Sequence, residues 1–527
     1  MRIRKVTVTG GRAALVQRLL RDTSIGLIAA IAVSTSVAAD DPDGTVGLTI
    51  YSSAQPGAIP PELYRPAPDA VIYPPGAIPG YAIVRHDRAL DLEQGRQALR
   101  FRDVAALIDP TTVRFSSLTD PDGTRVLEQN FQFDLVSAEK LMNRYLDREI
   151  TLERSVGDEV LTLTGRLLST QGGMTIEDRD GQIHLVNGYS AVRFPELPGG
   201  LITRPTLVWD VSAERGGEHR TRVSYETQGM TWWTDYNVIF REGRNANRGQ
   251  LDLSAWVSIV NQSGASYPEA KLKLIAGDVQ RVTPDRVYRQ RVEETAMMGA
   301  AADQGFAEKA FFEFHLYTLG RPTTLPDNST KQLELFPDVA DVPAEKLLVY
   351  YGLGAGFGGF FPDPVLDRDF GTQSNQKVDV YLRFDNAKQH GLGIPLPSGR
   401  MRVSRQDEAD ASLEFIGEDV IDHTPKDEKV LIRLGSAFDV VGERKQIDYQ
   451  VDVKARRLQE TIEIVLRNHK DEKIDVLVRE NLYRWLNWEI VDPSVPFDKV
   501  DARTVEFPVH VDADGEKTLR YTVRYSW

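Results

Sequence analysis

Residues Gly229–Asp278 carry the clearest strand pattern in the chain, with the sequence GMTWWTDYNVIFREGRNANRGQLDLSAWVSIVNQSGASYPEAKLKLIAGD. Apolar residues recur at every second position there: Leu251, Leu253, Ala255, Val257 and Ile259. A polar turn beginning at Asn261 ends this strand, and a second alternating strand follows through Leu272 and Leu274. A period of two predicts a β-sheet with one buried face.

The same layout of strand, asparagine, polar turn and strand recurs around Asn386 and Asn468. Three copies of one layout predict β-sandwich modules, although the copies share little sequence. We therefore expect a mainly β, multi-domain chain of sandwich modules with little helix.

A different pattern occupies residues 137–196. Ser137–Asp147 predicts a short helix with Ser137 as its N-cap, and five short strands punctuated by glycine turns follow. Short strands at this spacing predict a small β-barrel segment of the SH3-like or Sm-like type, an analogy of fold alone.

The first 39 residues have the pattern of a signal peptide. Six basic residues precede the apolar run Ile25–Val33, and Val37-Ala38-Ala39 supplies small residues before a cleavage site at Asp40. A membrane anchor is the alternative, but the apolar run is shorter than the ~20 residues of a span. We expect an exported chain, periplasmic or secreted, with outer-membrane association left open.

Composition limits the partners. The 527 residues carry a net charge of −14 and no cysteine. The acidic balance argues against nucleic acid as a partner, and the lack of cysteine excludes disulfides and thiolate metal sites. An envelope protein or a glycan is the partner class that we expect; the oligomeric state is left open.

Four domains are expected: the signal peptide 1–39, a β-domain 40–136, the helix and barrel 137–196, and sandwich modules 197–527 with an optional split near residue 440. A Pro-rich insertion, residues 53–80, lies in the second of these between two PGAIP copies. Proline removes backbone donors, so we expect a peripheral loop there. We also expect residues 285–310, which lose the alternation, to form a long, partly helical or disordered loop.

No motif identifies a catalytic, cofactor-binding or metal-binding residue. Gly354–Gly359 satisfies G-x-G-x-x-G, but Pro362 and Pro364 follow where a dinucleotide site needs a helix. The eight histidines show no metal-ligand spacing, and His315 is expected to be a bonded strand residue. Asp512–Glu516 predicts a hairpin turn rather than a calcium loop.

The best candidate for binding is the aromatic cluster Trp232, Trp233 and Tyr236. Adjacent strand residues point to opposite faces, so an exposed tryptophan here would stack on a sugar or a partner protein; the alternative is core packing of both. Trp256 has the parity opposite to the apolar face, and it is expected in the core only if both faces are covered.

Several segments resemble a bacterial exported family of unknown function that includes mucoidy inhibitor A. The residues and segments that carry the resemblance are Trp233 and Tyr236, Leu251–Asn261, Gly264, Tyr267, Leu272–Leu274, Phe314–Leu319, Leu325–Leu333, Leu396–Arg400 and Tyr521–Trp527. The resemblance is close over residues 200–527 and looser over 45–200, and the Pro-rich insertion departs from it. It implies an envelope protein and brings no catalytic residues.

These observations favour a non-enzymatic scaffold or binding protein of the cell envelope. Two alternatives remain: a glycan-active hydrolase with paired carboxylates beside an aromatic platform, or an outer-membrane β-barrel. The alternating C-terminal strand, which ends at Trp527, is compatible with a barrel, but proline-rich interruptions and charged outward positions favour a strand inside a sandwich, with Trp527 buried.

Overall fold

The structure is a computed structural model, which describes residues 44–51, 59, 78–156, 159–243, 245–277, 279–280, 306–353, 361–372, 374–407 and 409–527. The predicted signal peptide, the glycine-rich loop 354–359 and most of the ranges 53–80 and 285–310 lie outside these residues. The described part of 285–310 includes β16 (Phe306–Phe311), a strand where a loop was expected.

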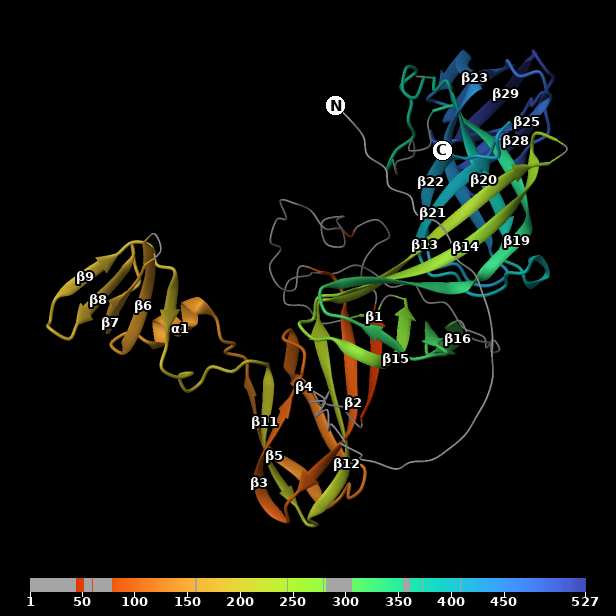
Figure 1. The fold of residues 1–527 in the computed structure, drawn as a ribbon. Coiled ribbons are helices and arrows are strands. Elements are labelled where there is room, and N and C mark those ends of the chain that lie inside the picture. Colours follow the sequence, from red (N-terminus) through yellow and green to blue (C-terminus); the bar gives the residue numbers. More distant parts are fainter. Residues whose placement is uncertain are drawn as a thin grey trace, which may run out of the picture. The chain divides into compact units, whose positions relative to one another are not determined.

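The chain is mainly β, as predicted. The described residues form 29 strands and one α-helix of seven residues (Figure 1). They include no helix that is both long and apolar enough to cross a membrane.

Most strands belong to four consecutive modules with one strand order. In each module a second strand runs antiparallel to the opening strand, a third strand runs antiparallel to a fourth, and the closing strand pairs with the second. In module I these five strands are β1 (Thr45–Tyr51), β2 (Tyr81–Leu92), β3 (Gly95–Arg102), β11 (Thr206–Ala213) and β12 (Gly217–Gln228).

Module I has two further strands, β4 (Ile108–Ser117) beside β12 and β5 (Thr124–Gln132) beside β11. Strands within residues 45–132 therefore share their sheets with β11 and β12 and, through β1, with β15 (Tyr267–Ala276), although these ranges were predicted to lie in different domains. The difference arises because strand pairing between distant segments leaves no local signal.

Module II follows the same order and includes β16. Its other strands are β13 (Met230–Glu242), β14 (Arg248–Asn261), β15 (Tyr267–Ala276), β17 (Phe314–Leu319), β18 (Thr323–Leu325) and the first half of β19 (Ser329–Tyr351). The predicted strand pattern is confirmed: Leu251, Leu253, Ala255, Val257 and Ile259 are all buried.

Modules III and IV complete the series. Module III consists of the second half of β19, β20 (Lys377–Asp385), η2 (Lys388–His390), β21 (Gly399–Gln406), β22 (Leu413–Ile421) and the first half of β23 (Lys429–Asp452). Module IV consists of the second half of β23, β24 (Arg457–Asn468), β25 (Ile474–Asn481), β26 (Trp488–Ile490), β27 (Asp498–Lys499), β28 (Thr504–Val511) and β29 (Glu516–Ser526).

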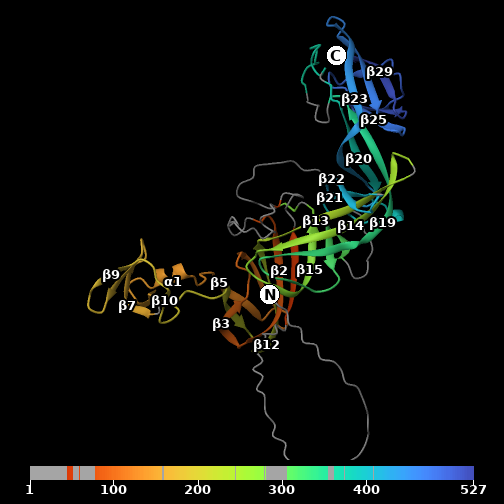
Figure 2. The same ribbon diagram turned by 45° about the horizontal axis from the view of Figure 1, so that its top comes forward.

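Long strands link the modules. The first half of β19 pairs with β14 and its second half with β20, so one strand closes module II and opens module III (Figures 1 and 2). β23 links modules III and IV in the same way. Only Gly229, at φ 79°, separates β12 from β13. A left-handed residue breaks the strand there without a steric cost.

A second link is a parallel pairing. The third strand of each later module lies beside the opening strand of the module before it: β15 beside β1, β21 beside β13, and β25 beside β19.

A buried asparagine holds the loops together in each of modules II to IV. Asn261, Asn386 and Asn468 are at most 1% exposed. Each side-chain amide donates to a carbonyl in its own loop and to a carbonyl before the closing strand, for example from Asn468 to Glu472 (2.8 Å) and Asp512 (2.9 Å). The repeat predicted around these three residues is therefore confirmed, and its physical basis is the satisfaction of buried backbone groups.

The helix and five strands predicted for residues 137–196 are present. They are α1 (Ala138–Arg144), β6 (Glu149–Val156), β7 (Glu159–Ser169), β8 (Met174–Asp178), β9 (Ile183–Val186) and β10 (Ala191–Arg193). The Ser137 side chain accepts from the Lys140 backbone N–H, as expected of an N-cap. The sheet order is β10-β6-β7-β8-β9, and within the described residues β9 and β10 do not pair, so the predicted barrel is an open sheet.

Two large hydrophobic cores result. One extends through modules I to III, and the other fills module IV and includes Leu348, Tyr350 and Val378 of module III. Leu519, Tyr521, Val523 and Tyr525 of the last strand are buried in the second core, whereas Trp527 is only partly buried against it. The Asp512–Glu516 turn connects β28 to β29, which do not pair with each other, so the predicted hairpin is wrong.

Candidate functional site

Trp256 is an exposed aromatic residue on a regular sheet surface. Its side chain is 39% exposed, and it lies on the outer face of β14, opposite Asp235 of β13 and Glu334 of β19. Ser254 and Ser258 lie on the same face as Trp256, because alternate residues of a strand point to the same side. The condition for its burial, coverage of both faces, is therefore not met.

Polar side chains surround Trp256. Asn237, Gln332 and Glu334 are exposed on the neighbouring strands, and Gln332 donates to the Ser258 hydroxyl at 3.1 Å. We call the outer-face residues Trp233, Asp235, Asn237, Ser254, Trp256, Gln332 and Glu334 the Trp256 face. A ring with planar amides and a carboxylate around it offers one stacking surface and several hydrogen-bonding groups.

Asp235 has bonds on both carboxylate oxygens. Trp233 Nε1 donates to its Oδ2 at 2.8 Å, and Arg400 donates to its Oδ1 at 3.1 Å. Asp235 is 8% exposed. A carboxylate with these donors orients its neighbours but has little freedom to transfer a proton to a ligand.

The three residues predicted from the sequence as binding candidates lie beneath or beside this face. Trp232 and Tyr236 are in the first core, at 1% and 0% exposure, and the Tyr236 hydroxyl donates to the Pro397 carbonyl at 2.8 Å. Trp233 is on the outer face but only 8% exposed. The exposed tryptophan is Trp256 instead. The sequence signal for its exposure is its place in the alternation of β14, where it falls on the same face as the polar residue Ser254.

Two isoleucines of the Pro-rich insertion cover Trp233. Ile59 and Ile78, one from each PGAIP copy, form a small buried cluster with Trp233 and Val260. Both isoleucines are at most 5% exposed. These two positions of the insertion are therefore packed into the fold and are not peripheral.

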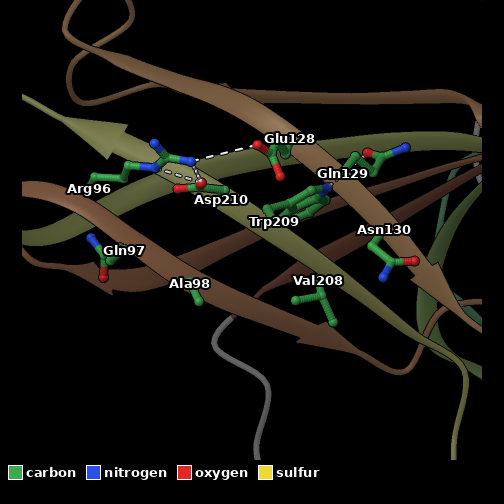
Figure 3. Close-up of a pocket in the computed structure, with 9 residues that line it drawn as sticks. All are labelled: Arg96, Gln97, Ala98, Glu128, Gln129, Asn130, Val208, Trp209 and Asp210. Atoms are coloured by element: carbon green, nitrogen blue, oxygen red, sulfur yellow. Dashed lines mark hydrogen bonds and ion pairs between the residues drawn. The ribbon is translucent and has the colours of Figure 1, made fainter. Parts of the chain in front are cut away.

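A separate hollow lies on the three-stranded sheet of module I (Figure 3). Arg96, Glu128 and Asp210 form ion pairs at its edge. Trp209 lies in its wall but is fully buried, and its Nε1 donates to Gln129 at 2.8 Å. The hollow is lined by both polar and apolar side chains, and its one aromatic residue offers no exposed ring on which a ligand could stack.

The strongest cluster of charged groups is buried in module IV. Arg444, Glu460, Glu480 and Arg484, which we call the buried quartet, are 1–3% exposed. Arg444 Nε donates to Glu480 at 2.8 Å and Arg484 Nε to Glu460 at 2.9 Å. Burial, followed by the charge of Glu480, raises the pKa of the Tyr521 phenol, which donates to Glu480 at 2.5 Å. Each carboxylate has an arginine and no access to solvent, so the cluster is an anchor and not a reaction centre.

The histidine prediction is confirmed for His315, whose Nδ1 lies 2.7 Å from Glu308. Within the residues that the structure describes, no group of three or more histidine, aspartate or glutamate side chains could hold a metal ion.

Comparisons of the chain with family models, with curated proteins and with solved structures found no match. The resemblance to the family of mucoidy inhibitor A thus stays a prediction.

Proposed function

We propose that the chain is a non-enzymatic scaffold and binding protein of the bacterial cell envelope, and that the Trp256 face binds glycan. The observation that carries this proposal is the 39% exposure of Trp256 on a regular sheet surface. An indole packs its apolar face against the C–H face of a sugar ring, and the surrounding amides and hydroxyls bond to sugar hydroxyls.

The modules support the scaffold part of the proposal. A binding residue on a strand shared by paired neighbours has little freedom to move, since β14 pairs along its length with both β13 and β19. Preorganisation lowers the entropy cost of binding. The bonded state of Asp235 favours binding over hydrolysis.

Sedimentation with insoluble glycans tests the proposal. The exported form, with Asp40 as its first residue, is expected to sediment with purified peptidoglycan sacculi or chitin. Trp256→Ala should reduce binding about tenfold, since loss of one stacked ring costs ~1–1.5 kcal/mol in addition to the loss of buried apolar area. The unfolding free energy of this variant should differ from that of the unaltered protein by less than about 1 kcal/mol.

The matched control is Trp488→Ala in module IV. Trp488 is partly buried, with the Lys499 ammonium 4.7 Å from the centre of its ring, and lies on β26, five strands away from β19 in the strand order of the sheet. This variant should bind as the unaltered protein does. Equal binding by Trp256→Ala, or no sedimentation of the unaltered protein with either glycan, would refute the proposal.

A further inference from the structure

Each opening strand pairs with the second strand of its module along one edge, and the modules differ in what lies along the other edge. β1, β13 and β19 each receive a parallel strand there, namely β15, β21 and β25. The opening strand of module IV, the second half of β23, pairs with β24, and within the described residues no parallel strand lies on its other edge.

The equivalent position on β23 follows from the register. In module II the parallel strand pairs with Thr234–Phe240, which begins four residues beyond Met230, the residue opposite Asn261. In module IV, Val440 lies opposite Asn468, so the same offset gives Arg444–Gln450. We call this stretch the open edge.

Among the described residues, an irregular segment bonds to the backbone of the open edge only at its start and meets its far end through a side chain. We call residues 365–372 and 374–376 the strap. Gly442 donates its N–H to the Gln376 carbonyl at 3.1 Å, and Arg444 donates its N–H to the Ser374 hydroxyl at 2.8 Å. Further along, the contact is made by a side chain, since the Tyr449 hydroxyl donates to the Leu366 carbonyl at 2.5 Å.

The buried quartet fixes the strap. Arg484 donates to the carbonyls of Val365 (3.1 Å), Asp367 (2.7 Å) and Phe370 (3.3 Å), and Arg444 donates to Gly371 (3.2 Å). Beyond Arg444, Ile447 of the open edge is 45% exposed, and Val451, the residue directly after the open edge, is 43% exposed. Exposed edges of this kind pair with further strands unless they are guarded.

Module I has the complementary strand. β3 is the third strand of its module, and among the described strands it pairs only with β11. β15, β21 and β25, which hold the same place in modules II to IV, each lie in parallel beside an opening strand. β3 is thus a third strand without an opening strand beside it, and the open edge belongs to an opening strand without a third strand beside it.

The charges of the two edges are opposite. The outer positions of β3 carry Arg96, Arg100 and Arg102, all exposed. The corresponding face of β23 carries Lys445 near the start of the open edge, then Asp448, and Asp452 two residues beyond its end, all exposed, so the charges of the two strands are opposite beyond Lys445. Opposite charges on neighbouring strands favour pairing and set its direction.

We propose that copies of this chain associate head to tail, by parallel addition of β3 of one copy to the open edge of β23 of another. The strap limits the site at Arg444 and so fixes where the added strand begins. Because the two contact surfaces differ, the contact is heterologous and does not close into a dimer by itself.

Cysteine cross-linking tests the proposal directly, because the chain has no cysteine of its own. A copy with Ala98→Cys in β3 is mixed with a copy with Ile447→Cys in β23 and oxidised. A disulfide-linked pair is expected. The control replaces Ile447→Cys by Val420→Cys, at an exposed position of β22 (47% exposed), and should not cross-link.

Sedimentation velocity over a concentration series gives the second measurement. Arg100→Asp with Arg102→Asp, or Asp448→Arg with Asp452→Arg, should each weaken association about tenfold. An equimolar mixture of the two variants should recover it, because the reversed edges again carry opposite charges. A protein that is monomeric at every concentration, or that cross-links equally well through Val420→Cys, would overturn the proposal.

Discussion

The opening strands of modules II and IV occupy equivalent places, but β13 faces a regular parallel strand and β23 faces the strap. β13 and β21 pair over seven residues, in the register Thr234–Phe240 with Gly399–Arg405. Such a ladder satisfies its own backbone groups. The strap has no ladder, and its carbonyls accept instead from Arg444 and Arg484.

This difference explains where charge is buried. Asp235 and Arg400, the ion pair on β13 and β21, lie on the outer face, where the arginine is partly solvated. The quartet of module IV lies inside the core because only a guanidinium supplies several fixed donors to an irregular backbone. Glu460 and Glu480 then compensate the two buried cations.

The largest expected effect comes from breaking the quartet. Glu460→Gln leaves Arg484 buried without its counter-charge, which should cost about 3–5 kcal/mol of unfolding free energy. Glu463→Gln, on the same strand but in an exposed pair with Arg520, should cost less than about 1 kcal/mol. Urea unfolding measures both values, and hydrogen exchange should show the strap opening first. Equal losses in the two variants would show that the quartet does not hold module IV.

The second effect compares the asparagines. Asn261→Ala and Asn468→Ala each leave buried carbonyls without a donor, and each should cost about 1–3 kcal/mol. Asn487→Ala, at an exposed loop position, is the control and should be near neutral. If only one of the two buried asparagines affects unfolding, modules II and IV are not energetically equivalent despite their shared strand order.

The third effect is a pH dependence that originates beside the first core and is absent at neutral pH. His86 of β2 lies beside Tyr225 and Phe101, and burial, followed by the charge of Arg88, lowers its pKa from 6.5 to about 3. The unfolded chain therefore binds a proton that the folded chain excludes. Above pH 6.5 His86 is neutral in both states and causes no loss of stability. As the pH falls from 6.5 toward 3, the free energy of unfolding decreases by up to about 1.4 kcal/mol per pH unit.

Unfolding measured between pH 6.5 and 4 checks this expectation, with His86→Gln as the comparison variant. The unaltered protein should lose more stability on acidification than the variant, and exchange of the β2 amides should increase before that of the β24 amides. Parallel curves for the two proteins would contradict the assignment to His86.

The sequence by itself determined the local features. Period-two alternation identified the strand Arg248–Asn261 and its buried face, and Ser137 identified the helix start. The repeated asparagines identified modules II to IV. Each of these depends on neighbours within a few residues, where side-chain parity and backbone capping act.

Only the tertiary structure decided which strands meet. It placed β1 beside β15 and brought the quartet together from β23, β24, β25 and the segment after β25. It also left Trp256 exposed while the two PGAIP isoleucines covered Trp233. The physical reason is that pairing and burial between distant segments depend on register and chain closure, and neither leaves a periodic signal in the sequence.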